Sequence, residues 1–281
     1  MALLMGEVSE NQVLNDESVV GVARVVYGFI GTGTIAEAII DGLMASALGA
    51  TSSVIVSPRN EQVSSRLRAR YPKVTVAQSN QQVVDGCEIL VLAVRWQVAH
   101  EVLREVLIPA NTTVISVIAA TDHDALARWT GVRVERIVRA IPLPFVAQRE
   151  GVTAIYPRDQ AASELFDAMG TAVCCDSKAE FDQLAVASAL MGTYFGVLEL
   201  VASWLEAKGM SSAKAQSYLK PLFASLGNFA RESAGVGFTG LRGEFSTKGG
   251  LNEQVFRDFE NQGGGAALLA ALDNVLNKIE G

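Results

Sequence analysis

The stretch from Val25 to Leu43, VVYGFIGTGTIAEAIIDGL, decides the fold of this chain. A short apolar run leads into the spacing G-x-G-x-x-A, formed by Gly31, Gly33 and Ala36, and a segment with helical spacing follows at once. This is the arrangement of a dinucleotide-binding turn, in which the first glycine permits a tight bend and the second lets a diphosphate approach the backbone. The sequence therefore predicts a strand, a diphosphate-binding turn and a helix whose first amides receive the negative charge.

Outward from this turn, short β-branched runs alternate with helix-like stretches as far as residue 157. The runs predicted to be buried strands are 25–27, 54–56, 89–92, 114–117 and 137–138, and the helix-like stretches between them include 35–48 and 60–70. Strands and helices at this interval are typical of a parallel sheet with right-handed crossovers. We therefore expect residues 21–157 to form a Rossmann-type dinucleotide-binding domain of the α/β class.

The chain changes character after Pro157. Helix-like segments interrupted by glycine-rich bends follow, and they cover 161–169, 181–208, 212–234 and 253–279. The segment 181–208 is apolar on more than one face, so we expect a dimerisation helix, with the central helix of a monomer as the alternative. Residues 158–281 are predicted to form an all-α dimerisation and substrate domain, and residues 1–20 a loose N-terminal extension.

The composition excludes several classes of protein. Hydrophobic residues make up 49% of the 281 positions, so the chain can bury a large core and is not disordered throughout. An excess of 30 acidic over 23 basic residues argues against non-specific nucleic-acid binding. Two His and three Cys are too few for a multi-ligand metal site or a disulfide framework, and they fit a reducing cytoplasm. The uncharged run 183–198 is shorter than the about 20 residues of a spanning helix, so no membrane association is expected.

The end of the second predicted strand indicates which dinucleotide binds. An acidic residue there would bind the ribose 2′-hydroxyl of NAD, but this chain has Ser57, Pro58 and Arg59, with no carboxylate before Glu61. A hydroxyl and a guanidinium suit a 2′-phosphate, because arginine binds phosphate oxygens through two parallel hydrogen bonds. We therefore expect NADPH as the cofactor, with NADH as the alternative.

Four stretches between about residues 25 and 276 together resemble the pyrroline-5-carboxylate reductase family. They are GFIGTGTIAEAIIDGL (28–43), ILVLAVRWQ (89–97), VRAIPLPFVAQREGVTAIY (138–156) and STKGGL (246–251). The resemblance implies an oxidoreductase that transfers a hydride from NAD(P)H to the C=N carbon of 1-pyrroline-5-carboxylate, which gives proline. It also implies a homodimer or higher homo-oligomer in which each site combines the α/β domain of one chain with the helical domain of its partner.

The resemblance also assigns residues to the site. At the diphosphate of the cofactor it places Gly31, Thr32, Gly33, Thr34 and Ile35, and at the 2′-phosphate Ser57 and Arg59. It places Asn80 near the adenosine ribose, and Ala93, Val94 and Arg95 beside the nicotinamide. The loop whose backbone N–H groups hold the substrate carboxylate corresponds to Lys248, Gly249, Gly250, Leu251 and Asn252. Tyr194 and Asn252 are the polar groups expected nearest the substrate, as catalytic candidates, with a purely structural role as the alternative.

The chain departs from the family where the substrate would bind. Leu143 and Pro144 replace an Asn and a Thr, and the family's S-G-S-G-P-A-Y is S-A-L-M-G-T-Y at 188–194. Its P-G-G-T-T is K-G-G-L-N at 248–252, which preserves the two glycines. Two alternatives therefore stay open: a reductase of a different small imine or 2-oxo acid, and a catalytically inactive dinucleotide-binding regulator.

Three other groups of polar residues are expected to be structural. The run 122–124, Asp-His-Asp, suits the start of a helix better than acid–base chemistry. Arg139 is expected to form an ion pair at a strand end instead of touching the substrate. Cys174 and Cys175 are expected to be inert, because adjacent cysteines form strained bridges.

Overall fold

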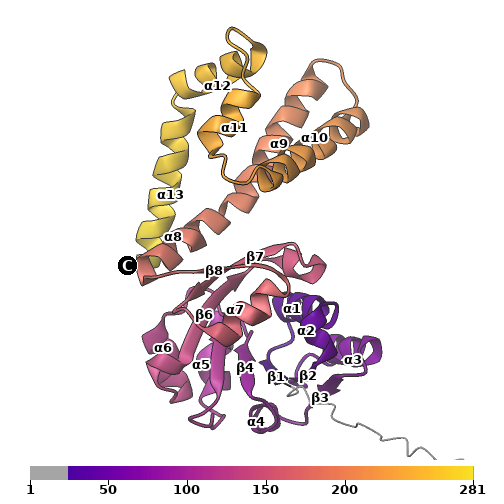
Figure 1. Ribbon diagram of the computed structural model, residues 1–281, viewed down its shortest axis with the longest axis vertical. Coiled ribbons are helices and arrows are strands. Elements are labelled where there is room, and N and C mark those ends of the chain that lie inside the picture. The colour runs from indigo at the N-terminus through magenta and orange to yellow at the C-terminus, as the bar shows by residue number, and fades with distance from the viewer. Residues whose placement is uncertain (1–24, 281) are drawn as a thin grey trace, which may run out of the picture.

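The chain, described by a computed structural model over residues 25–280, consists of a sheet-and-helix half and a helical half (Figure 1). Eight strands form one sheet in the order β3-β2-β1-β4-β5-β6-β7-β8. Their bounds are β1 (Val25–Ile30), β2 (Ser52–Val56), β3 (Val74–Val76), β4 (Ile89–Leu92), β5 (Thr113–Ser116), β6 (Ile137–Pro142), β7 (Gly151–Tyr156) and β8 (Gly170–Cys174). The strands β1 to β6 pair in parallel in the doubly wound order, which confirms the Rossmann-type fold.

Helices cover both faces of this sheet. They are α1 (Thr34–Met44), α2 (Ala47–Ala50), α3 (Glu61–Arg70), α4 (Asn80–Asp85), α5 (Trp96–Leu103), α6 (His123–Thr130) and α7 (Gln160–Asp167), with short 3₁₀ turns η1 (Val134–Arg136) and η2 (Pro144–Gln148). Successive strand residues point to opposite faces, so Phe29 joins one buried cluster and Ile30 the other. Burial on both faces explains why these strands are nearly continuous apolar runs.

The structure corrects the expected domain boundary at residue 157. The strand β8 still belongs to the sheet, because β7 pairs antiparallel with β6 and β8 pairs parallel with β7. The helix α7 connects β7 to β8. The α/β half therefore ends at about Cys174. The sequence GTAVC of β8 is short and half exposed, so it lacks the buried β-branched pattern that predicted the central strands. The expected extension at residues 1–20 lies outside the described residues.

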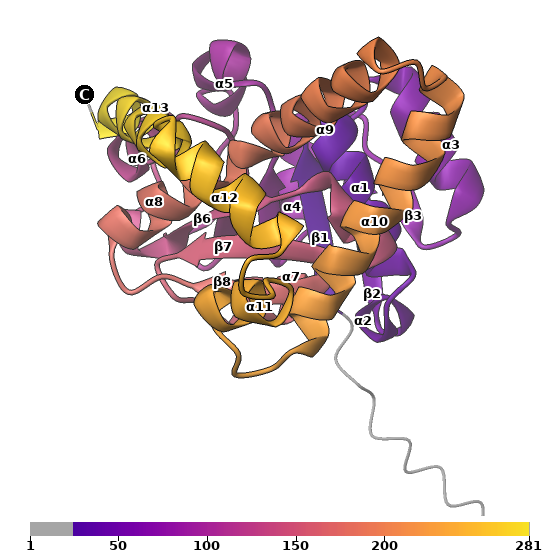
Figure 2. The same ribbon diagram turned by 90° about the horizontal axis from the view of Figure 1, so that it is seen from above.

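The helical half consists of α8 (Lys178–Ser188), α9 (Leu190–Ala207), α10 (Ser212–Glu232), α11 (Phe238–Glu244), α12 (Leu251–Asn261) and α13 (Gly264–Glu280). The pair α8–α9 and the helix α13 diverge from the sheet as two arms (Figures 1 and 2). The helix predicted over 253–279 is divided at Gly263, whose φ is +82°. The stretch Lys178–Ala207, with a mean hydropathy of 1.7 in its most apolar window, is long and apolar enough to cross a membrane by length and composition alone.

Candidate functional site

The turn between β1 and α1 lies at the carboxyl edge of the sheet, where the strand order reverses between β1 and β4. Ligands bind at this reversal in doubly wound sheets. Gly31 has a φ of +98°, and a Cβ atom there would lie 2.6 Å from the carbonyl oxygen of Ala93. Gly33 is exposed, and nothing lies within 4 Å of the place its Cβ would take. The first position therefore requires glycine, and the second leaves the backbone open to a ligand.

The start of α1 is free to receive an anion. Its N-cap is Gly33, which has no side chain that could accept a hydrogen bond from the N–H groups of the first turn. Free amides and the helix dipole attract negative charge, and a diphosphate fits this seat. Thr34 is exposed beside it, while Ile35 packs half-buried on the core. Thr32 faces inward, and its buried Oγ1 has no hydrogen-bond partner among the residues described.

The loop after β2 contributes in a way that the sequence pattern did not predict. Ser57 is buried, and its Oγ accepts a hydrogen bond from the Gly31 amide at 3.0 Å. Asn60, which was not predicted as a site residue, donates through Nδ2 to the Thr32 carbonyl oxygen at 3.1 Å. Arg59 lies between them and is exposed. The roles of Ser57 and Arg59 at a 2′-phosphate stay predictions, but both residues lie on the loop that contacts the turn.

The residues predicted for the nicotinamide side follow β4 at the same edge. The carbonyl oxygen of Ala93 faces Gly31, Val94 is half-buried, and Arg95 is exposed as the N-cap of α5. Asn80 begins α4 and is half-buried. The parallel pairing of β1 with β4 thus brings two segments about 60 residues apart in sequence to one edge.

The predicted substrate loop lies on the helical half, at the end of the α11–α12 connection and the start of α12, far from the turn within one chain (Figure 1). Gly249 has a φ of +74°, and its amide donates to the Glu253 carboxylate at 2.5 Å. The Asn252 side chain donates through Nδ2 to the carbonyl oxygen of Phe245 at 2.6 Å. Lys248 and Leu251 are exposed. One chain alone therefore does not bring this loop and the cofactor turn together.

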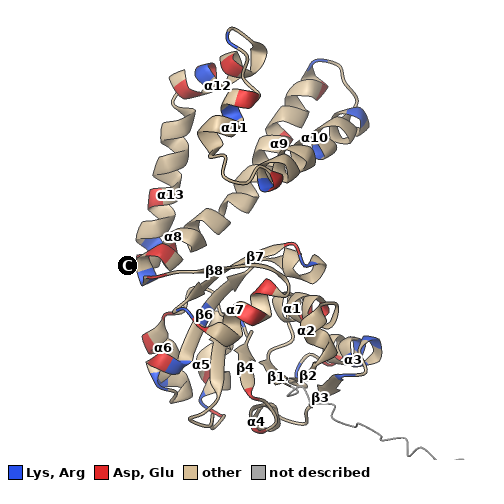
Figure 3. Cartoon of the chain, in the orientation of Figure 1, with Lys and Arg blue, Asp and Glu red and all other residues tan. Residues whose placement is uncertain are grey.

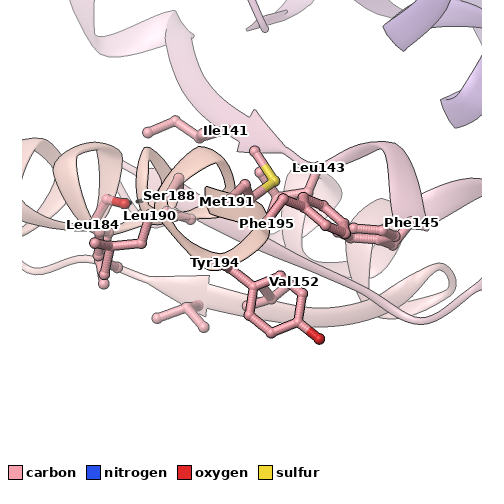
Figure 4. A pocket seen from close by; sticks show the side chains of 13 residues that line it. Ile141, Leu143, Phe145, Val152, Leu184, Ser188, Leu190, Met191, Tyr194 and Phe195 are labelled. Atoms are coloured by element: carbon pink, nitrogen blue, oxygen red, sulfur yellow. Dashed lines mark hydrogen bonds between the residues drawn. The ribbon is translucent and has the colours of Figure 1, made fainter. Parts of the chain in front are cut away.

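Tyr194 belongs to a third region, an apolar cavity of about 460 Å³ between the sheet and α8–α9 (Figure 4). The replaced residues Leu143, Leu190 and Met191 line this cavity, as do Tyr194 and Ser188. The hydroxyl of Ser188 donates its proton to the Leu184 carbonyl oxygen at 2.8 Å, so towards a ligand it can act only as an acceptor. The Tyr194 ring lies 5.0 Å from that of Phe195 and is partly exposed. Among the described lining residues, its phenol is the side chain that can still donate a hydrogen bond to a ligand.

Two of the three groups expected to be structural, the 122–124 run and Arg139, make structural contacts, and the inertness of the two cysteines stays a prediction. Asp122 is the N-cap of α6 and accepts from the Ala125 amide at 2.6 Å. Arg139 pairs with Asp182 of α8, Nη1 to Oδ1, at 3.9 Å, and burial lowers the pKa of its guanidinium. Burial also lowers the pKa of His123, and the nearby Arg139 adds to this. Cys174 and Cys175 are free thiols.

Known proteins match both halves of the chain. A family model described as NADP oxidoreductase coenzyme F420-dependent matches residues 26–120. The chain is 25% identical to the pyrroline-5-carboxylate reductase of Pseudomonas aeruginosa over 256 residues, which cover 87% of this chain and 92% of that protein. A solved pyrroline-5-carboxylate reductase from Coxiella burnetii has a TM-score of 0.77 at 22% identity, covering 91% of this chain and 97% of that one. The Plasmodium falciparum pyrroline carboxylate reductase with NADP bound has a TM-score of 0.72 at 16% identity, with coverage of 91% and 97%.

Proposed function

The chain belongs to the pyrroline-5-carboxylate reductase family, and from that premise we propose that it reduces 1-pyrroline-5-carboxylate to proline with NADPH. It is an NAD(P)H-dependent oxidoreductase acting on a CH–NH bond. The observation that carries the proposal is the open diphosphate seat, where Gly31 makes the bend and Gly33 leaves the start of α1 uncapped. The exposed Arg59 beside it supports NADPH over NADH.

The residues of the chain bind and orient the cofactor and the substrate, which is what hydride transfer needs. When bound, NADPH would supply the hydride, and a protonated C=N carbon of the substrate would be its acceptor. The amides at the start of α1 hold the diphosphate, and the backbone of 93–95 lies at the edge where the nicotinamide would extend. Asn252 and Tyr194 supply polar groups to the substrate, and the loop 248–252 supplies backbone N–H groups to its carboxylate.

The active form is a homodimer in which each site takes the cofactor turn from one chain and the substrate loop from its partner. The helices α9, α12 and α13 bury none of their described residues. Trp204 is 60% exposed and Leu200 73% exposed on α9. Covering such surface releases about 25 cal/mol per Å² of apolar area, so a second copy stabilises these arms. This also accounts for the apolar stretch Lys178–Ala207 without a membrane, in a cytoplasmic enzyme whose described cysteines are all free thiols.

A second candidate function is the reduction of a different small imine or a 2-oxo acid. The cavity beside Tyr194 is lined by Leu143, Leu190 and Met191, which offer no group to a carboxylate. The amide of Gly249 is already bonded to the chain's own carboxylate at Glu253. Both observations favour a small imine without a carboxylate, whereas a 2-oxo acid would still carry that group.

One assay separates these functions. Purified protein is mixed with NADPH and, in turn, pyrroline-5-carboxylate, 1-pyrroline and a small 2-oxo acid, and the nicotinamide absorbance is followed. A decrease with pyrroline-5-carboxylate as the preferred substrate supports the proposal. Preference for another acceptor selects the second candidate. Tight NADPH binding with no oxidation by any acceptor identifies a dinucleotide-binding regulator.

A further inference from the structure

Two side chains of the loop after β2 hold the diphosphate-binding turn. The Oγ of Ser57 accepts from the Gly31 amide at 3.0 Å, and the Nδ2 of Asn60 donates to the Thr32 carbonyl oxygen at 3.1 Å. These bonds join residues 26 and 28 positions apart, so they are tertiary contacts. Together they fix the Gly31–Thr32 dipeptide at its first N–H and its last C=O.

The loop that makes these bonds is itself fixed. The Ser57 amide donates to the Phe29 carbonyl oxygen at 3.0 Å, which extends the pairing of β1 with β2. The Oδ1 of Asn60 accepts from the Val63 amide at 3.4 Å, so Asn60 is also the N-cap of α3. Arg59 lies between the two residues that hold the turn. Its backbone is therefore held at a set position relative to the diphosphate seat.

We infer that Asn60 and Ser57 are positioning residues that fix Arg59 relative to the diphosphate seat. The inference rests on the proposed use of NADPH. This cofactor carries a diphosphate and a 2′-phosphate at a separation limited by its covalent structure. Two anion-binding groups bind it best when the protein holds them at the matching separation before the ligand arrives.

A simple capping role for Asn60 makes a different prediction. The helix α3 is also joined to α1 by the ion pairs Arg66–Glu37 and Arg70–Asp41, each with an N···O distance of 2.8 Å. The helix therefore stays in place when the bond to Thr32 is lost. Serine caps helices about as well as asparagine, but its side chain is shorter and carries no amide. Asn60→Ser thus keeps the cap and removes the bond to the turn.

The test is calorimetric titration of NADPH and NADH into the full chain, without substrate. Asn60→Ser is expected to raise the Kd about tenfold for NADPH and about threefold for NADH, because one hydrogen bond and the placement of Arg59 are both lost. In an Arg59→Ala background, Asn60→Ser should raise the Kd for NADPH only by the factor by which it raises the Kd for NADH. The reason is that the effects of two coupled residues are not additive. Asp159→Ser, which exchanges the N-cap of α7 away from the turn, should leave both Kd values unchanged.

The outcomes separate this inference from the proposed function. If the wild-type chain binds neither nucleotide, the proposed function is wrong and the inference is wrong with it. If the wild type binds NADPH but Asn60→Ser binds NADPH and NADH each as tightly as the wild type does, only the inference is wrong. The same conclusion follows if Asn60→Ser raises the Kd for NADPH by the same factor in the wild-type and Arg59→Ala backgrounds. Ser57→Ala removes the other bond to the turn and should weaken NADPH more than NADH in the same way, which keeps the test decisive if Asn60→Ser does not fold.

Discussion

The two halves of the chain differ in where their apolar side chains lie. In the α/β half, Phe29, Ile39 and Leu90 are fully buried between the sheet and its helices. In the helical half, Phe238 is 85% exposed and Leu251 80% exposed. The charged residues of the helical half lie at both ends of its arms, and long stretches of α9 and α13 between them carry few charges (Figure 3). The α/β half thus buries its apolar side chains within one chain, and the helical half leaves many of its own exposed.

The largest expected effect comes from placing charge on the uncovered arm. The double substitution Leu200→Glu and Trp204→Glu should convert the proposed dimer to a monomer, because carboxylates on α9 cannot be buried unpaired. Reductase activity should fall at least about 100-fold, equivalent to about 2.7 kcal/mol of transition-state stabilisation, since each site loses the partner's loop. Light scattering after size exclusion measures the mass, and NADPH binding should persist.

The control for this experiment is Leu107→Glu, which adds one carboxylate at an 83% exposed position of the α/β half. It should change neither mass nor activity. A double variant of α9 that keeps its wild-type mass and activity would show that the arm is not an interface.

The next largest effect is expected at Gly31 and Gly33, the two glycines of the cofactor turn in the α/β half. Gly33→Ala meets nothing within 4 Å, so the melting temperature should stay unchanged while the Kd for NADPH rises about tenfold, or about 1.4 kcal/mol. Gly31→Ala should instead destabilise the fold by about 1–3 kcal/mol, because its φ is +98°. Thermal melting and nucleotide titration of both variants separate the two effects. Unchanged NADPH affinity in Gly33→Ala would exclude the turn as the diphosphate seat.

A smaller effect is expected at the predicted substrate loop, which the proposed dimer brings to the cofactor turn of the other chain. Asn252→Ala removes the bond to the Phe245 carbonyl oxygen and a polar group predicted to lie at the substrate. The value of kcat/KM should fall about three- to tenfold, the effect of one neutral hydrogen bond, while the Kd for NADPH stays constant. Steady-state kinetics and titration check this. Identical kinetics in the variant would remove Asn252 from the site.

The smallest effect concerns pH and the buried groups of the α/β half. Burial raises the pKa of the Cys87 thiol to about 11, above its usual value of about 8.5 when exposed. As pH rises, the unfolded chain loses this proton first, so stability is full below about pH 8.5 and declines as pH approaches 11. The melting temperature should fall over this range by a few degrees, and less steeply in Cys87→Ala. Parallel slopes for the two proteins would contradict this assignment.

Much of the α/β half was predictable because its signals are local. The run 89–92 is buried throughout and became β4, and Gly31 and Gly33 occupy the two positions that the turn requires. The strand β8 was missed because its residues are small and half exposed. Asn60 was missed because a helix cap and a contact to a distant turn look the same in sequence. Its bond to Thr32 depends on how β2 lies beside β1.

The sequence by itself determined the strand–turn–helix unit, the α/β class and the apolar character of the arms, because period, glycine spacing and apolar content act over a few neighbouring residues. Only the tertiary structure decided that Ser57 bonds to Gly31, that Glu253 occupies the amide of Gly249, and that the substrate loop lies away from the turn within one chain. These depend on which surfaces meet after the chain has folded back on itself. No local pattern encodes those distances.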